Sequence, residues 1–217
     1  RIDRKGAANA KIPELGSLDA TALVAQLQSG NGWIRDKAQQ LLLWRGKTPE
    51  AIAALKTIAL SAPEPLTRLH ALCTLDGFGE LGSAKDALLA ALHGPHPGLR
   101  ENALRLAESS ADPDIRTAAL ALFDDPDAKV RLQLAFTLGE WDSPEAGQAL
   151  AALLAKDQGD PFLVTAALSS ALPHLRVLAA SATPAARSQL LPMALAAKDR
   201  EALAILLAPA FDFEKTP

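Results

Sequence analysis

The sequence predicts an all-α protein, a right-handed α-solenoid of about five helical hairpins. First, four arginines recur at steps of 33, 32 and 31 residues, and a period near 32 is typical of a repeat architecture. Second, hydrophobic residues make up 49% of the chain but aromatic residues only 4%, so the apolar content is mostly the strong helix formers Ala and Leu. Third, no stretch between residues 18 and 208 alternates apolar and polar side chains as a strand does. The repeating arginines are Arg35, Arg68, Arg100 and Arg131.

Residues 1–17 come before the repeats. They hold Gly, Pro and charged residues and lack helical periodicity, so we expect a linker or the tail of a preceding domain. Residues 18–217 are expected to form the repeat domain. The chain begins at Arg1 and its one methionine is Met193, so we expect a processed protein or a fragment of a longer one.

The second helix of each hairpin opens with the same short pattern. A polar residue lies four positions before the arginine, Gly or Pro usually lies three before it (Ala128 is the exception), and Ala or Leu lies three after it. A polar N-cap followed by proline at the first helical position favours a helix start. A fifth copy begins at Asp160-Pro161 and carries Val164 in the arginine position. The pattern predicts second helices over 32–45, 65–76, 97–109, 128–140 and 161–172.

Several first helices are marked by Ser or Thr followed by proline. Such pairs begin at Thr48, Ser143 and Thr183. The segment Asp112–Arg116 repeats the arginine pattern at half the period, and we assign it to a first helix. First helices are therefore predicted over 19–28, 49–61, 83–92, 113–123, 144–156 and 184–197.

The end of the array departs from the pattern. Pro173 should end the fifth second helix, so residues 174–182 are expected to be an insertion or a short extra helix. A final helix over 199–208 is too apolar for the outer edge of a solenoid. We therefore expect Leu203, Leu206 and Phe211 to be covered, either by the tail that follows residue 210 or by another chain or domain.

The predicted core is a stripe along each second helix. The apolar residue before the arginine lies on one helical face with the residues three and seven positions after the arginine. Thr67 interrupts this stripe in the second hairpin, where Leu66 is expected to take its place. The stripe residues in three hairpins are Ile34, Ala38, Leu42, Leu99, Ala103, Ala107, Val130, Leu134 and Leu138.

The four arginines themselves are interpreted as structural. A guanidinium can donate to a carboxylate or carbonyl in bidentate fashion, so we expect each arginine to bridge to an acidic or carbonyl group of the neighbouring hairpin. The alternative is a row of arginines that binds an anion.

These features together resemble the HEAT-repeat family of armadillo-like helical hairpins. The resemblance covers roughly residues 18 to 208 and implies a protein-binding or scaffold role, with the second helices lining a concave face. A narrower resemblance involves NGWIRDKAQQLLLWRG at 31–46 and VTAALSS at 164–170. These segments are similar to the helical section of large bacterial multidomain proteins that carry a sugar-dehydrogenase-like β-propeller and a c-type haem domain. Any haem or dehydrogenase chemistry would lie outside this chain, which has no CxxCH motif.

If second helices line the concave face, the positions two, five and nine after each arginine face outward. That row mixes polar and aromatic side chains, as protein interfaces do. Trp44 is the strongest single candidate, because it falls off the apolar stripe and tryptophan is frequent at binding hot spots. The predicted protein-binding residues are Lys37, Gln40, Trp44, His70, Asn102, Arg105, Gln133, Phe136 and Glu140, with Cys73 in the same row.

Other residues that could carry chemistry have simpler interpretations. His93 and His96 are only two imidazoles, and a structural zinc site needs four ligands. Cys73 lies inside a predicted helix without a nearby base, as buried inert cysteines do. The cluster Asp124, Asp125 and Asp127 lacks the spacing of a calcium loop and is interpreted as a capped turn. No phosphate loop or hydrolase motif is present, so we predict no catalysis, no metal and no cofactor.

The predicted function is a non-catalytic protein interaction or intramolecular scaffold domain. The partner is another protein or another domain of the same polypeptide. A net charge of −3 argues against a nucleic-acid surface, and no apolar run is long enough to enter a membrane. One alternative is the helical section of a multidomain extracytoplasmic redox protein, which would place the chain in the periplasm; otherwise it is cytoplasmic. A second alternative is a HEAT-like enzyme, such as a DNA glycosylase or a chromophore lyase.

Overall fold

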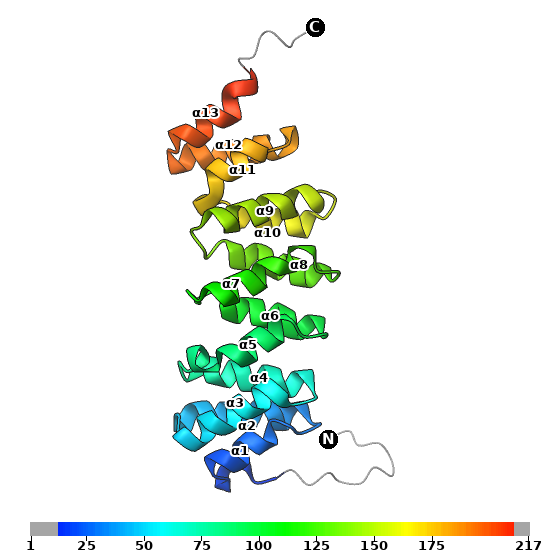
Figure 1. Ribbon diagram of the computed structural model, residues 1–217, viewed down its shortest axis with the longest axis vertical. Helices are drawn as coiled ribbons and strands as arrows, with labels where there is room; N and C mark the ends of the chain where they lie inside the picture. Colours follow the sequence, from blue (N-terminus) through cyan, green and yellow to red (C-terminus); the bar gives the residue numbers. More distant parts are fainter. Residues whose placement is uncertain (1–12, 211–217) are drawn as a thin grey trace, which may run out of the picture. The chain divides into compact units, whose positions relative to one another are not determined.

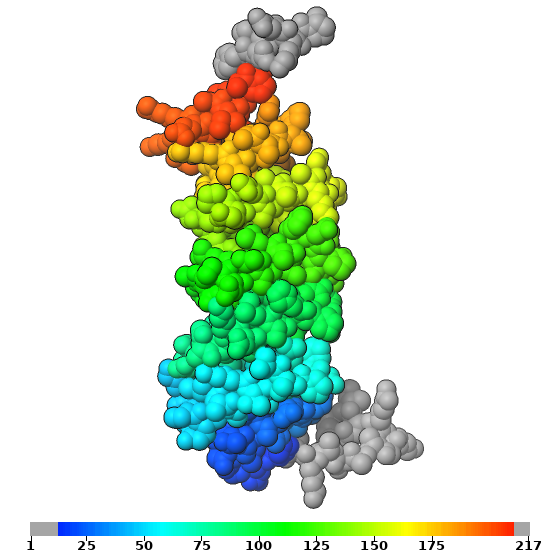
Figure 2. Space-filling view, in the orientation of Figure 1, coloured from blue at the N-terminus to red at the C-terminus, as the bar shows by residue number. Residues whose placement is uncertain are grey.

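The computed structural model describes residues 13–210, and within them the protein is an all-α solenoid without strands (Figure 1). In the space-filling view, side chains fill the spaces that the ribbon leaves between neighbouring helices (Figure 2). Contacts divide the chain into two compact units, Arg1–Ala87 and Leu88–Pro217, which are described separately.

Unit 1 contains two helical hairpins. Helices α1 and α2 form the first hairpin, and α3 and α4 form the second. Like helices stack, since α1 packs on α3 and α2 packs on α4. Arg45 fastens the start of the described chain, because its guanidinium donates to the carbonyl oxygens of Leu18 and of Gly16, the latter at 2.7 Å. The elements are η1 (Leu15–Ser17), α1 (Ala20–Gln26), α2 (Gly32–Arg45), α3 (Pro49–Ser61), α4 (Pro65–Gly77) and η2 (Leu81–Ala84).

Unit 2 continues the same arrangement. Second helices stack in the order α6, α8, α10, and α11 packs on α9. The boundary between the units falls inside α5 (Lys85–Leu92). The remaining elements are α6 (Pro97–Ala107), α7 (Pro113–Leu120), η3 (Ala121–Asp124), α8 (Ala128–Leu138), α9 (Pro144–Lys156), α10 (Pro161–Ser169), η4 (Leu172–His174), α11 (Leu175–Ser181), α12 (Pro184–Ala197), α13 (Arg200–Leu207) and η5 (Ala208–Ala210).

Helix starts follow the predicted caps. The side chains of Asn31, Thr48, Ser143 and Thr183 each accept a hydrogen bond from a backbone N–H of the first turn. Proline fits the first turn because its missing N–H has no partner there in any case. The predicted ranges of α2, α3, α9 and α12 are confirmed at both ends.

Several predicted helix ends are too late. The predicted helix 161–172 ends at Ser169, because Pro173 cannot continue an α-helix and itself lies in the η4 turn. The predicted helices 97–109 and 128–140 end at Ala107 and Leu138. The predicted helices 83–92 and 113–123 each include one 3₁₀ turn, η2 and η3.

The predicted apolar stripe is buried in all three hairpins where it was assigned. In the second hairpin the prediction was wrong in detail. Thr67 keeps the core position, and its hydroxyl donates to the carbonyl of Leu27 at 3.2 Å. Leu66 is half exposed instead of replacing it. A buried hydroxyl is tolerated once it has a hydrogen-bond partner.

Of the two alternatives for residues 174–182, the short helix is confirmed, since α11 (Leu175–Ser181) lies there and packs on α9 as a first helix. It follows that α12 is the second helix of a sixth hairpin, and its assignment as a first helix was wrong. The sequence supports the structure, since Thr183, Pro184 and Arg187 repeat the arginine pattern. The pattern comes only 23 residues after position 164, because α11 is a seven-residue helix.

The last helix is covered in part, and the cover comes from neighbouring helices and not from the expected source. Helix α13 packs against α11 and α12, and Leu206 is buried there while Leu203 is half-buried. Phe211 lies outside the described residues. Among the described helices no single one is long and apolar enough to cross a membrane; the bent pair Pro161–Ser169 and Leu172–Ser181, with 76° between its halves, meets the criteria of length and composition only.

Candidate interaction surfaces

The side chains of the repeating arginines donate hydrogen bonds to backbone carbonyl groups that precede their own helix. Nη1 of Arg35, Arg100 and Arg131 donates to the carbonyl oxygen six residues earlier, at 2.7, 2.8 and 2.8 Å. Arg116, which carries the pattern at half the period, does the same through Nε at 3.0 Å. Arg68 reaches a carbonyl nine residues earlier, that of Ala59, at 2.9 Å. The arginine position therefore closes the turn within each of these hairpins.

In unit 2 two arginines also bridge to the next hairpin. Nε and Nη2 of Arg100 donate to the two carboxylate oxygens of Asp125 at 2.7 and 2.9 Å. Arg131 binds Asp157 in the same bidentate way at 2.8 and 2.9 Å. The predicted bridge to the neighbouring hairpin is confirmed for Arg100 and Arg131. It was wrong for Arg35 and Arg68, whose partner carbonyls, of Ser29 and Ala59, belong to their own hairpins.

The residue that occupies the position of the carboxylate acceptor explains why Arg100 and Arg131 bridge to the next hairpin and the arginines of unit 1 do not. Asp125 lies six residues before Arg131, and Asp157 lies seven before Val164. In the hairpin that follows Arg35 the corresponding residue is Ala62, and after Arg68 it is Gly94. Neither has a carboxylate, so the sequence itself restricts the ion pairs to unit 2.

Both acceptor carboxylates are held in the ionised form. The hydrogen bond from Arg131 lowers the pKa of Asp157 below its usual value. Burial alone would raise the pKa of Asp125, but the bonds from Arg100 and from the Asp127 N–H, with the charges of Arg100 and Arg131, lower it. These guanidinium groups are directed at protein acceptors, which supports a structural role for the arginines.

The unit 1 surface is the exposed side of α2 with one residue of α4. Trp44 is 73% exposed and borders a shallow hollow of ≈ 340 Å³, which is also lined by Asp36 and Leu43. The polar side chains around it are held in place. Lys37 Nζ donates to Gln40 Oε1 at 2.7 Å, and His70 Nδ1 lies 2.7 Å from Gln39 Oε1. Burial and the charge of Arg35 lower the pKa of His70, so this imidazole is neutral at pH 7.

The unit 2 surface lies on α6 and α8. Phe136 is 44% exposed, and Arg105 and Glu140 are also exposed. Asn102 is half-buried, and its amide donates to the carbonyl of Gly98 at 2.8 Å. Gln133 is half-buried as well. All nine predicted binding residues are therefore at least partly accessible, divided between the two units.

Glu108 was not predicted as part of this surface. Its carboxylate accepts hydrogen bonds from Gln133 Nε2 at 2.9 Å and from Thr137 Oγ1 at 3.4 Å. Burial is the largest influence and raises the pKa of Glu108, as does the charge of Glu140, and they outweigh these hydrogen bonds and the charge of Arg105. The sequence did hold a signal for it: Glu108 lies eight positions after Arg100, next to the position nine after the arginine that was predicted to face outward.

The other aromatic residues near helix ends differ in role. Trp141 is buried, its Nε1 donates to the carbonyl of Glu108 at 3.0 Å, and the guanidinium of Arg116 lies 5.3 Å from the ring centroid. It is a packing residue of unit 2. Trp33 and Phe162, two positions before Arg35 and Val164, are both exposed.

The candidate metal and nucleophile residues form no site. No group of three or more His, Cys, Asp or Glu side chains in residues 13–210 could hold a metal ion. Cys73 lies half-buried in α4. Of the acidic cluster, Asp124 pairs with Lys156, Asp125 binds Arg100, and Asp127 caps α8. Each carboxylate thus has a structural partner.

Residues 85–172 match a family model of HEAT repeats. The HEAT match begins at α5 and ends in η4, so it contains both bridging arginines and the unit 2 surface. It covers less than half of the chain. No curated protein matches the sequence. HEAT repeats indicate a helical-repeat scaffold or interaction role, and such repeats are generally not enzymes.

Proposed function

We propose that the chain is a non-catalytic protein interaction or intramolecular scaffold domain. Its partner is another protein or another domain of the same polypeptide. The contact surfaces are the exposed side of α2 with His70 in unit 1, and the exposed sides of α6 and α8 in unit 2. The HEAT-repeat match in residues 85–172 supports this role.

Exposed aromatic side chains on second helices carry the proposal. Trp44 presents most of its indole to solvent beside the hollow on α2, and Phe136 is exposed on α8. Large aromatic side chains that project between polar groups with fixed positions are typical of binding hot spots. The neighbouring Lys37, Gln40 and Gln133 are already oriented by hydrogen bonds, so little side-chain entropy is lost on binding.

A photo-crosslinking experiment tests the proposal on the full-length protein. Phe136→benzoylphenylalanine and Trp44→benzoylphenylalanine should each crosslink to one defined partner protein or to a distant segment of the same polypeptide. Phe123→benzoylphenylalanine is the matched control, since Phe123 is 43% exposed but lies in η3 and not on a second helix. Equal crosslinking at position 123, or none at positions 44 and 136, would contradict the proposal.

A second proposal concerns the larger protein. The segments 31–46 and 164–170 favour the helical section of a multidomain redox protein with a propeller and a c-type haem domain. Such a protein would be extracytoplasmic, and in it this chain would keep the same fold while being joined to those two domains. The gene sequence on both sides of this chain tests the second proposal. We expect it to encode a propeller before residue 1 and a CxxCH motif after residue 217. If both are absent, the second proposal is wrong and the proposal of a cytoplasmic scaffold stands.

A HEAT-like enzyme is not proposed. A DNA glycosylase or chromophore lyase needs a pocket in which ionisable groups converge. In the described residues no observation favours either activity.

A further inference from the structure

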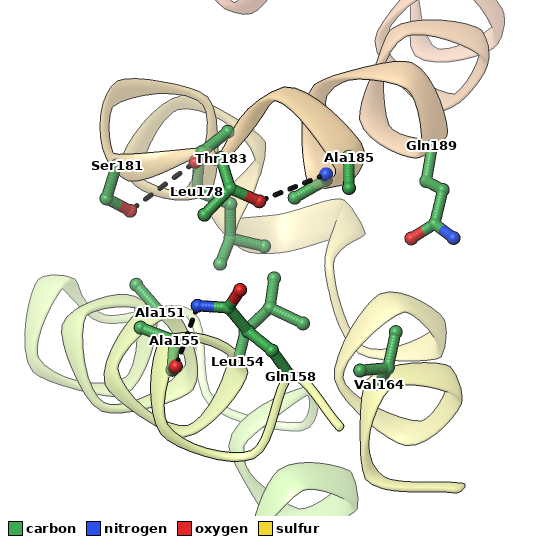
Figure 3. A pocket seen from close by; sticks show the side chains of 12 residues that line it. Ala151, Leu154, Ala155, Gln158, Val164, Leu178, Ser181, Thr183, Ala185 and Gln189 are labelled. Carbon is green, nitrogen blue, oxygen red and sulfur yellow. Dashed lines mark hydrogen bonds between the residues drawn. The ribbon is translucent and has the colours of Figure 1, made fainter. Parts of the chain in front are cut away.

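An apolar pocket of ≈ 170 Å³ lies within unit 2, between the hairpin α9–α10 and the hairpin α11–α12 (Figure 3). Its walls are uncharged throughout, and small or aliphatic side chains form most of them. Figure 3 shows Gln158 and Val164 on one side, with Leu178 and Gln189 on the other.

The pocket occupies the place of an arginine–aspartate bridge. Val164 stands in the arginine position of the fifth hairpin. Ser181 lies six residues before Arg187, just as Asp125 lies six before Arg131. Both Val164 and Ser181 line the pocket. The step from the fifth to the sixth hairpin has therefore lost both members of the ion pair that joins the preceding steps.

The packing of the second helices explains why the space stays open. Helix α8 packs closely on both α6 and α10, whereas α10 and α12 make at most slight contact. At the two preceding steps an arginine side chain extends to the next hairpin. Here valine is too short to do so, and Ala151, Ala155 and Ala185 add little bulk on the other walls.

The chemistry of the walls defines the occupant. Because no lining residue is charged, a charged group would lose its hydration without gaining a partner. The volume suits a single apolar group, since a cavity of about 150 Å³ holds a benzene-sized molecule. Gln158 uses its Nε2 on the carbonyl of Ala155 at 2.9 Å, which leaves its Oε1 to accept. The exposed amide of Gln189 makes no hydrogen bond to the described residues and can both donate and accept.

We propose that this pocket receives one apolar side chain, of leucine or phenylalanine size, from an uncharged segment of a partner polypeptide. The amides of Gln158 and Gln189 would bind the peptide groups on either side of that residue. The proposal rests on the proposed interaction function, but it concerns a surface separate from Trp44 and Phe136.

The test restores the missing bridge. In the variant Val164→Arg/Ser181→Asp the arginine side chain should cross and fill the pocket to reach the new carboxylate, in the way that Arg131 reaches Asp157 one step earlier. The probe is N-acetyl-leucine N-methylamide at millimolar concentrations, and the readout is the shift of the Leu154, Val164 and Leu178 methyl NMR signals. We expect saturable shifts of these methyl signals in the wild-type chain. Binding to the double variant, followed on Leu154 and Leu178, should be at least about tenfold weaker.

A second variant keeps the test valid if the double variant does not fold. Ala155 is exposed at the pocket wall, so Ala155→Leu should narrow the pocket without disturbing the core and should also weaken binding. N-acetyl-lysine N-methylamide is the charged control and should not shift these methyls. Equal shifts with the lysine probe, or unchanged binding in both variants, would overturn the proposal. Because a two-component titration needs no native partner, its failure is distinct from a failure of the crosslinking experiment.

Discussion

At the scale of single residues, one position of the repeat has two structural roles. The arginine closes its own turn through a backbone carbonyl, and in unit 2 it also binds the carboxylate of the next hairpin. The first role needs only the arginine, whereas the second also needs an aspartate about 25 residues later. The ion pairs are therefore set by two positions of the sequence, and only one of them belongs to the repeat pattern.

Removal of a bridging arginine should be more costly than removal of one that only closes a turn. In Arg100→Ala the buried Asp125 loses its cationic partner and keeps only the hydrogen bond from the Asp127 N–H, which costs about 3–5 kcal/mol for a buried pair. In Arg68→Ala a single hydrogen bond from the charged guanidinium to a carbonyl is lost, which costs about 1.5–3 kcal/mol. Urea unfolding of both variants measures the difference. Equal losses would show that the bridge adds nothing to the closure of the turn.

The titration of Glu108 makes the free energy of unfolding change with pH in the direction opposite to that caused by the bridging aspartates. Its pKa in the folded protein is raised, so the folded state favours the protonated form. Stability is therefore lost as the pH rises from the ordinary glutamate pKa of about 4.3 through the folded value. Glu108→Gln should be slightly more stable than the wild type at pH 7 and nearly equal to it at pH 3. Thermal melts at both pH values check this, and a destabilised variant at pH 7 would contradict it.

At the scale of helices, the end of α12 holds one unfavourable conformation. Lys198 follows the helix with φ of 56°, in the left-handed region. The N–H of Asp199 donates to the carbonyl of Ala194 at 3.0 Å, which closes the helix end. Glycine adopts this conformation without the steric cost that a Cβ atom brings.

Lys198→Gly should therefore stabilise the protein by about 1 kcal/mol, reduced somewhat by the greater freedom of glycine in the unfolded chain. Lys198→Ala is the matched control and should bring no gain, because alanine keeps the Cβ atom. Denaturant midpoints of the two variants provide the comparison. A gain in the alanine variant alone would show that the lysine charge, not the backbone, is responsible.

Helix positions were predictable because they depend on local chemistry. A capping side chain followed by proline fixes a helix start within two residues, as at Thr48 and Ser143. Helix ends depend on how the next turn packs, which explains the late ends predicted for α6, α8 and α10. The role of α12 was missed because the shortness of α11 changes the period, and a fixed period near 32 does not anticipate a step of 23.

The surfaces were less predictable than the helices. Counting from the arginine found exposed residues such as Trp44 and Phe136, because helical geometry fixes which face they occupy. It did not find Glu108, whose significance depends on Gln133 and Thr137 of a neighbouring helix. The pocket was also missed, because it depends on Val164 and Ser181 together and on two second helices, α10 and α12, that make at most slight contact.

At the scale of the whole molecule, the two units follow one sequence pattern but join their hairpins differently. The stacked second helices of unit 2 carry arginine–aspartate bridges, and the family match lies mostly within this unit. Unit 1 uses the same arginine position without an acidic partner, and it carries Trp44, the more exposed of the two aromatic candidates. If the chain is a scaffold, contact with its partner should therefore be most visible at Trp44.

The three tryptophans offer a direct measure of that contact, because they range from buried to largely exposed. With 5-fluorotryptophan, each residue gives one ¹⁹F signal, assigned through single Trp→Phe variants. In this chain alone, the Trp44 signal should show a large shift between H₂O and D₂O, the Trp33 signal an intermediate one, and the buried Trp141 signal almost none. In the full-length protein or its complex, contact at the α2 surface should reduce the solvent shift of Trp44 and leave that of Trp141 unchanged. A Trp44 signal with the same solvent shift in every context would mean that the α2 surface is not where the partner binds.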